Sequence, residues 1–201
     1  MKEQLIKIPQ NQKIRLKNFS ADYSQGFKDK EEVKKKVEKN LQTMMDLQDV
    51  LYAHDKYSIL LILQSMDAGG KDGTIRHVMS GVNPQGCQVF SFKKPSDEEL
   101  DHEYLWRIHK SLPERGRIGI FNRSYYEEVL VARVHPEILQ REKLPAELIT
   151  KDVWKKRFQQ INDFERYLYE NGTRIIKLYL HISKDEQKKR FLARQQDETK
   201  N

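Results

Sequence analysis

A short apolar run that leads directly into a glycine-bearing turn constrains this sequence more than any other feature. Residues 57–63 form a short apolar run between polar flanks, with consecutive aliphatic side chains from Ile59 to Leu63. The run is too short for a helix and predicts a buried strand. The turn that follows carries Gly69, Gly70, Lys71 and Gly73. A helical pattern then runs to Met79. A strand, a glycine-bearing turn and a helix in this order predict an α/β fold with an anion site where the helix begins.

The rest of the chain alternates strands with helices in the same way. We expect further strands at residues 87–92, 117–121 and 174–182, and helices at residues 29–53, 96–108, 150–171 and from 183 onward. Such alternation is typical of a mostly parallel sheet that is covered by helices. We interpret residues 1–201 as one domain, in which residues 1–30 form a loosely built arm.

Composition restricts the classes of protein to which the chain can belong. Charged residues make up 33% of the 201 residues, and no apolar run approaches the about 20 residues that span a bilayer, so we expect no membrane partner. The single cysteine, Cys87, excludes an internal disulfide framework and predicts a reducing, cytoplasmic location. Lys and Arg number 37 against 30 for Asp and Glu, and the resulting net charge of +7 favours a polyanionic partner.

The glycine-bearing turn contains the parts that a phosphate-binding loop needs. Glycines let backbone N–H groups point inward around an anion, the helix N-terminus lies behind it, and a lysine reaches the phosphates. The usual pattern, G-x-x-x-x-G-K-[ST], is altered here. Ser65 replaces the first glycine, Asp72 replaces the metal-binding hydroxyl, and Thr74 stands two positions too late for that role. An ordinary strand-to-helix turn with an incidental lysine is the alternative interpretation.

Three polar residues beside this loop are candidates for phosphate and metal binding. Asp67 would repel phosphates unless a divalent cation lay between them, so we interpret it as a Mg²⁺ ligand, direct or through water, or else as a helix cap. Asn122 ends the third predicted strand, where phosphate-loop proteins usually carry an acid, and we expect an acid there to be tolerated. Its carbonyl oxygen can ligate a metal or hold a metal-bound water. Arg123 is placed to bind phosphate oxygens in a bidentate manner.

Four motifs together are similar to those of the type-2 polyphosphate kinase family. They lie at residues 65–74, 80–86, 91–93 and 120–136, and the last begins Ile120-Phe121-Asn122-Arg123-Ser124-Tyr125-Tyr126. The resemblance runs from about residue 15 to the end and is strongest to the third class, which accepts nucleoside mono- and diphosphates. It implies a three-layer α/β/α P-loop kinase fold with a mostly parallel sheet and a helical lid. It also implies Mg²⁺-dependent phosphoryl transfer, with Mn²⁺ as a substitute, between inorganic polyphosphate and AMP, ADP or ATP, as well as GMP and GDP.

The resemblance also implies roles for individual positions. The implied catalytic residues are Asp67, Lys71, Asn122, Arg123, Arg133, Arg190 and Arg194, with Asp67 as the metal ligand. The implied phosphate- or nucleotide-binding residues are Ala68, Gly69, Gly70, Asp72, Gly73, Thr74, Lys93 and Glu128. Arg190 and Arg194 match arginines of the lid, which begins at residues 183–201. Family chains continue past this position, so we expect a lid that is cut short.

Two other functions compete with this interpretation. An ATP-dependent nucleoside monophosphate kinase of the thymidylate-kinase kind also places a lid and an arginine near a phosphate loop. A non-catalytic nucleic-acid-binding protein would account for the net charge. The basic residues of this chain, however, are not interleaved with aromatic ones on a predicted strand face, so we expect no nucleic-acid partner. The amphipathic helices predicted at residues 29–53 and 150–171 offer a face for a homo-oligomer.

Overall fold

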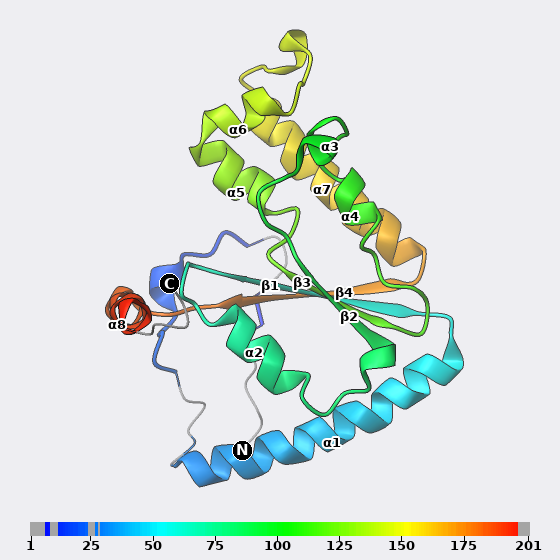
Figure 1. The fold of residues 1–201 in the computed structure, drawn as a ribbon, viewed down its shortest axis with the longest axis vertical. Coiled ribbons are helices and arrows are strands. Elements are labelled where there is room, and N and C mark those ends of the chain that lie inside the picture. The colour runs from blue at the N-terminus through cyan, green and yellow to red at the C-terminus, as the bar shows by residue number, and fades with distance from the viewer. Residues whose placement is uncertain (1–6, 9–11, 24–26, 28, 197–201) are drawn as a thin grey trace.

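One parallel sheet forms the centre of the molecule, which is a computed structural model that describes residues 7–8, 12–23, 27 and 29–196 (Figure 1). Its strands in this part of the chain are β1 (Ser58–Ser65), β2 (Cys87–Ser91), β3 (Ile118–Asn122) and β4 (Thr173–Leu180). They pair in the order β2-β3-β1-β4, and every pairing is parallel. The expected parallel α/β sheet is therefore confirmed.

Helices cover both faces of this sheet. The described helices are α1 (Lys30–His54), α2 (Lys71–Val78), α3 (Asp97–Leu100), α4 (Trp106–His109), α5 (Glu127–Val134), α6 (Pro136–Arg141), α7 (Val153–Glu170) and α8 (Lys184–Gln195), with short 3-10 turns at Leu16–Asn18, Pro84–Gly86 and Ala146–Leu148. Figure 1 shows α1 and α2 on one side of the sheet, α3 to α7 on the other, and α8 beyond the end of β4. This is the expected three-layer arrangement. Among these described helices, none has the length and apolarity to cross a membrane.

The two central strands and the long helix α7 form the main core. Every residue of β3 is buried, and Leu60 and Ile62 of β1 are almost fully buried, as expected for strands that helices cover on both faces. The stripe predicted on residues 150–171 supplies Ile161, Phe164 and Leu168 to the same cluster. Burial of apolar surface of this kind is the main source of stability in such a domain.

The register of β1 and β3 brings their carboxyl ends to one edge of the sheet. Leu63 pairs with Asn122, so the loop after β1 and the loop after β3 emerge side by side. Helix α2 leaves β1 toward one face, whereas α5 leaves β3 toward the other (Figure 1). In parallel α/β sheets such a divergence opens a crevice in which ligands bind.

The prediction of one continuous helix at residues 96–108 is wrong, because the structure has two short helices there, α3 and α4. A capping box begins α3: Ser96 Oγ accepts a hydrogen bond from the Glu99 N–H, and the Glu99 carboxylate accepts one from the Ser96 N–H. Helix α3 ends at Leu100, and the carboxylate of Glu103 then accepts the N–H of Leu105 just before α4 begins. This local acceptor competes with continued helical hydrogen bonding.

Candidate active site

The loop between β1 and α2 has the backbone shape of an anion-binding turn. Gly70 adopts a left-handed conformation with φ of 94°, and Ala68 does the same with φ of 59°. A Cβ atom at Gly69 would lie 2.3 Å from the Oγ of Ser65, so only glycine fits there. Gly73 and Thr74 continue into the first turn of α2, where the Thr74 N–H donates to the carbonyl of Gly70.

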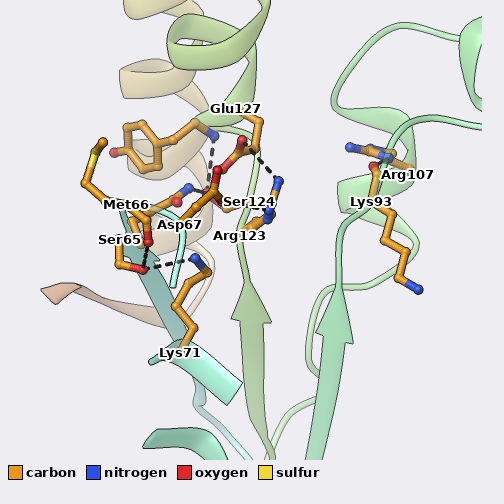
Figure 2. A network of polar contacts seen from close by, with 11 residues as sticks. Ser65, Met66, Asp67, Lys71, Lys93, Arg107, Arg123, Ser124 and Glu127 are labelled. Atoms are coloured by element: carbon orange, nitrogen blue, oxygen red, sulfur yellow. Dashed lines mark hydrogen bonds and ion pairs between the residues drawn. The ribbon is translucent and has the colours of Figure 1, made fainter. Parts of the chain in front are cut away.

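Lys71 is the first residue of α2, and its side chain folds back across the loop. Its Nζ donates a hydrogen bond to the Oγ of Ser65 at 3.0 Å, and Ser65 in turn donates to the carbonyl of Met66 at 2.8 Å (Figure 2). Partial burial lowers the pKa of Lys71, and the nearby guanidinium of Arg123 lowers it further. The carboxylates of Asp67, Glu127 and Asp72 raise the pKa of Lys71. The ammonium thus stands at the centre of a compact group of charges.

Arg123 crosses from the end of β3 toward this loop. Its backbone is left-handed with φ of 65°, and its N–H donates to the carbonyl of Leu63 on β1. Its guanidinium donates to Asp67 Oδ1 at 3.3 Å and lies 4.0 Å from a carboxylate oxygen of Glu127 (Figure 2). The Asp67 side chain is 71% exposed, so its carboxylate is accessible to ligands.

Asn122 and Asp72 meet directly, although they lie on different elements. The Nδ2 of Asn122 donates to Asp72 Oδ1 at 2.5 Å and to the Oγ of Ser91 at 3.4 Å. Asn122 is buried at the end of β3, with 8% of its surface exposed, whereas Asp72 is exposed in the first turn of α2. The strand therefore fixes the amide, and the amide fixes the orientation of the carboxylate.

A set of contacts that the sequence did not predict fastens the loop after β3. Gln64 donates to the Oγ of Ser124 at 3.0 Å. Tyr125 and Tyr126 both donate to Oε1 of Glu165 on α7, and Lys177 of β4 donates to its other oxygen at 2.6 Å. Burial raises the pKa of both tyrosine hydroxyls. These partners lie far apart in the sequence, and no local pattern signals that they meet.

Helix α8 contacts the phosphate loop through its polar side chains. Arg190 donates from Nη1 to the carbonyl of Ala68 at 3.2 Å and from Nε to Glu186 at 2.7 Å. Gln187 donates to the carbonyl of Asp67 at 2.8 Å. Ser183 caps the helix by accepting the Glu186 N–H, but the Glu186 side chain binds Arg190 instead of closing a capping box.

Two hollows lie near this site. The first is a cavity of about 460 Å³ between the loop after β3, helices α5 and α6, and the segment before α4. Its walls combine apolar residues with charged residues of both signs. They include Phe92, Pro95, Leu100 and Ile138, the basic residues Lys93, Arg107 and Arg123, and the acidic residues Glu99, Glu127, Glu128, Glu137 and Glu142. The second, of about 800 Å³, is open and is lined by Gly69, Gly70, Gly73, Thr74, His77 and Arg190, among others. Arg123 thus lines the first hollow, and Arg190 of α8 lines the second.

Glu128 lies in the wall of the first cavity, within a buried group of charges. Arg157 of α7 lies 3.4 Å from Glu128 and donates to Glu142 at 2.7 Å, and its guanidinium stacks on the ring of Tyr104. Burial and the neighbouring Glu128 raise the pKa of Glu142 to about 8. A signal for Arg157 was available, because it interrupts the apolar stripe of α7 midway between Val153 and Ile161.

The remaining candidates differ in their relation to the loop. Lys93 lines the first cavity, and its carbonyl accepts a hydrogen bond from Arg107. Arg133 and Arg194 are exposed, and no contact described in this structure joins either of them to the loop. Within the described residues, no three acidic, His or Cys side chains are grouped closely enough to hold a metal ion alone.

A glycine-bearing loop with a central lysine, at the carboxyl edge of a parallel sheet, defines this molecule as an α/β protein of the P-loop kinase type. Comparison with known proteins specifies the family. The model of the family described as polyphosphate kinase 2 matches residues 27–201, and the chain belongs to this family. The expected family is confirmed, and with it the expected class of enzyme, a polyphosphate:nucleotide phosphotransferase.

The similar proteins agree with this assignment. An ADP-polyphosphate phosphotransferase from Rhodopseudomonas palustris is 51% identical over all of this chain and 70% of its own length. An AMP/ADP-polyphosphate phosphotransferase from Meiothermus ruber is 44% identical over 90% of this chain and 64% of its own length. The crystal structure of polyphosphate kinase 2 from Arthrobacter aurescens TC1 superposes with a TM-score of 0.84 at 38% identity, covering 96% of this chain and 66% of that one. The chain thus spans about two thirds of the length of these relatives.

Proposed function

We propose that this protein transfers a phosphoryl group between inorganic polyphosphate and nucleoside mono- and diphosphates, with AMP and ADP as acceptors. The observation that carries the proposal is the convergence of Lys71 and Arg123 at the phosphate loop, where Arg123 lines one hollow and the loop glycines line the other. Phosphoryl transfer depends mostly on positioning and on neutralising the charge of the transferring group. Two cations that approach one another from different elements, Lys71 from the start of α2 and Arg123 from the end of β3, meet that need.

The two hollows suggest separate places for the two substrates. The 460 Å³ cavity combines apolar walls with Lys93, Arg107 and Arg123, which suits a nucleotide whose base is buried and whose phosphates point toward the loop. The open hollow suits a flexible polyanion, because the glycines of the loop at the start of α2 and the guanidinium-bearing Arg190 line it. We place polyphosphate there and the nucleotide in the cavity.

The donor set fits a magnesium ion held jointly with substrate. Mg²⁺ keeps several waters and takes one or two carboxylates together with phosphate oxygens, so a closed protein cage is not needed. The exposed carboxylate of Asp67, at the mouth of the loop, is the group that would hold it. When bound, the ion neutralises phosphate charge, and Mn²⁺ can supply the same chemistry.

The proposal extends to the wider setting of the enzyme. We include GMP and GDP among the acceptors, a homo-oligomeric state and a cytoplasmic location. The exposed apolar side chains Leu47 and Val50 on α1 support an oligomer, and a single cysteine thiol suits a reducing compartment. Light scattering of the purified chain measures its oligomeric state. We also regard residues 1–201 as one P-loop kinase domain, which the single sheet of the described residues supports.

The test is a transfer assay without ATP. The protein is incubated with AMP or ADP, long-chain polyphosphate and Mg²⁺, and products are separated by ion-exchange chromatography. We expect ADP from AMP and ATP from ADP, with no product when polyphosphate is left out.

A parallel reaction supplies ATP with AMP or dTMP and omits polyphosphate. Product in that reaction alone would contradict the proposal and favour a nucleoside monophosphate kinase of the thymidylate-kinase kind. GMP and GDP in the first reaction test how far the acceptor range extends.

A further inference from the structure

Asp72 and Asn122 carry the polar groups that a phosphate loop presents to a cation, but at exchanged positions. In the usual arrangement a Ser or Thr hydroxyl follows the lysine, and a carboxylate stands at the end of the neighbouring strand. Here the carboxylate of Asp72 follows Lys71, and the neutral amide of Asn122 ends β3. Each arrangement contains one acid and one neutral partner.

The contact between the two side chains has a defined polarity. A carboxylate can only accept hydrogen bonds, so the amide nitrogen of Asn122 must face Asp72. The separation is 2.5 Å, and the amide makes a further contact with the Oγ of Ser91 at 3.4 Å. Asn122 is buried on a central strand and has little freedom, so it orients the exposed carboxylate of Asp72 through a charge-assisted hydrogen bond.

Asp72 also belongs electrostatically to the site already described. Asp72, like Asp67 and Glu127, raises the pKa of Lys71, whereas Arg123 lowers it. Its carboxylate is accessible at the start of α2, beside the glycine turn. Mg²⁺ in nucleotide sites keeps most of its water shell, and a carboxylate can bind that shell without displacing it.

We propose that Asp72 supplies the carboxylate that holds the hydration shell of the cation, and that Asn122 is its positioning residue. The inference rests on the proposed function, because the cation accompanies the phosphates of the substrates. Asp67 remains the direct ligand in this arrangement. A purely structural role, in which Asp72 only stabilises the N-terminus of α2, is the competing explanation.

The exchange changes what should be expected of an acid at position 122. From the sequence alone, Asn122→Asp should be tolerated. In the structure that acid would lie at hydrogen-bonding distance from Asp72, in a buried position, and two carboxylates so close repel one another. We therefore expect the single variant to be impaired, and the double variant Asp72→Ser with Asn122→Asp to recover by regenerating the usual pair.

Binding of Mn²⁺ in the presence of ADP tests the metal role without turnover. Free Mn²⁺ is measured by electron paramagnetic resonance for the wild type, Asp72→Asn, Asp72→Ser, Asn122→Asp and the double variant. Asp49→Asn, the same change on the exposed face of α1, is the matched control. We expect Asp72→Asn to weaken Mn²⁺ binding by about tenfold or more. The double variant should bind more tightly than either Asp72→Ser or Asn122→Asp, and the control should match the wild type.

Thermal unfolding without metal tests the pair independently. Asn122→Asp should lower the Tm, and adding Asp72→Ser should raise it again. If Asp72→Asn binds Mn²⁺ as well as the wild type does, or if the double variant recovers nothing, the inference is overturned. Should the wild type transfer phosphate while Asp72→Asn keeps its Mn²⁺ affinity, the inference alone fails. If the wild type neither binds Mn²⁺ nor transfers phosphate, the proposed function fails as well.

Discussion

The ammonium of Lys71 donates a hydrogen bond to the hydroxyl of Ser65, the residue that stands where phosphate loops usually have their first glycine. The lysine is thereby held across the loop by a neutral partner that a phosphate oxygen can replace. A hydroxyl can give up this bond at little cost, whereas an ion pair with a carboxylate would compete with the substrate. Ser65 therefore keeps Lys71 in position and available.

Lys71→Ala should remove nearly all phosphoryl transfer while leaving the fold intact. Loss of one preorganised contact to developing charge costs roughly 3 kcal/mol in the barrier, which is about 100-fold or more in rate. The measurement is the initial rate with ADP and polyphosphate, together with a thermal melt. Lys35→Ala on the exposed face of α1 is the control. Retention of more than about a tenth of the wild-type rate would refute the role.

Asp67→Asn should lower the rate and shift the Mg²⁺ dependence to higher concentration. The change removes the exposed carboxylate but keeps a side chain that can still lie beside Arg123. Rates are measured over a Mg²⁺ titration at saturating ADP and polyphosphate. An unchanged titration curve and rate would leave Asp67 with only a structural role at the loop.

Replacement of Arg190 by lysine should impair the enzyme. Arg190 divides its guanidinium between Ala68 and Glu186, and an ammonium has no planar fork with which to reproduce both contacts. Arg190→Lys should therefore lower both the rate and the affinity of the loop for polyphosphate.

Arg194 is exposed on the same helix, and we predict that it grips phosphate when the lid closes. Arg194→Ala should raise the KM for polyphosphate more than that for the nucleotide, and Arg194→Lys should not restore it. Steady-state kinetics at fixed salt measure both constants. If Arg194→Lys is as active as the wild type, this face of α8 is reduced to a solvated basic surface.

Glu142 should make stability depend on pH in the neutral range. Its pKa is about 8 in the folded protein and near the ordinary value when unfolded, so the folded state binds the extra proton between those values. Stability therefore falls as pH rises from about 5 to 8, by at most about 1.4 kcal/mol per pH unit, and levels off above that range.

Glu142→Gln carries no titrating proton, so this decline should become shallower in the variant. Urea unfolding of both proteins at pH 6, 7 and 8.5 measures the difference, in which the contributions of the histidines cancel. Parallel curves for the two proteins would show that the carboxyl ionises normally beside Glu128 and Arg157.

The features that the sequence predicted are those with local signals. The apolar run of β1 and the glycine turn after it are contiguous, so strand, loop and helix follow from neighbouring residues. Asp72 and Asn122 lie 50 positions apart, and their contact depends on the register of β1 against β3. Glu165 likewise reaches Tyr125 only through the packing of α7 on the sheet. Tertiary contacts of polar side chains leave no periodic pattern to read.

The hydrogen bond from Arg190 to the carbonyl of Ala68 joins a helix to a loop whose backbone is held in a left-handed conformation. An anion that binds the loop changes the electrostatic environment of that carbonyl, and a displacement of α8 breaks its hydrogen bond to Arg190. The two events are therefore thermodynamically linked, and linkage is reciprocal. If phosphate in the loop favours one position of α8 by a given factor, holding α8 in that position raises the affinity for phosphate by the same factor.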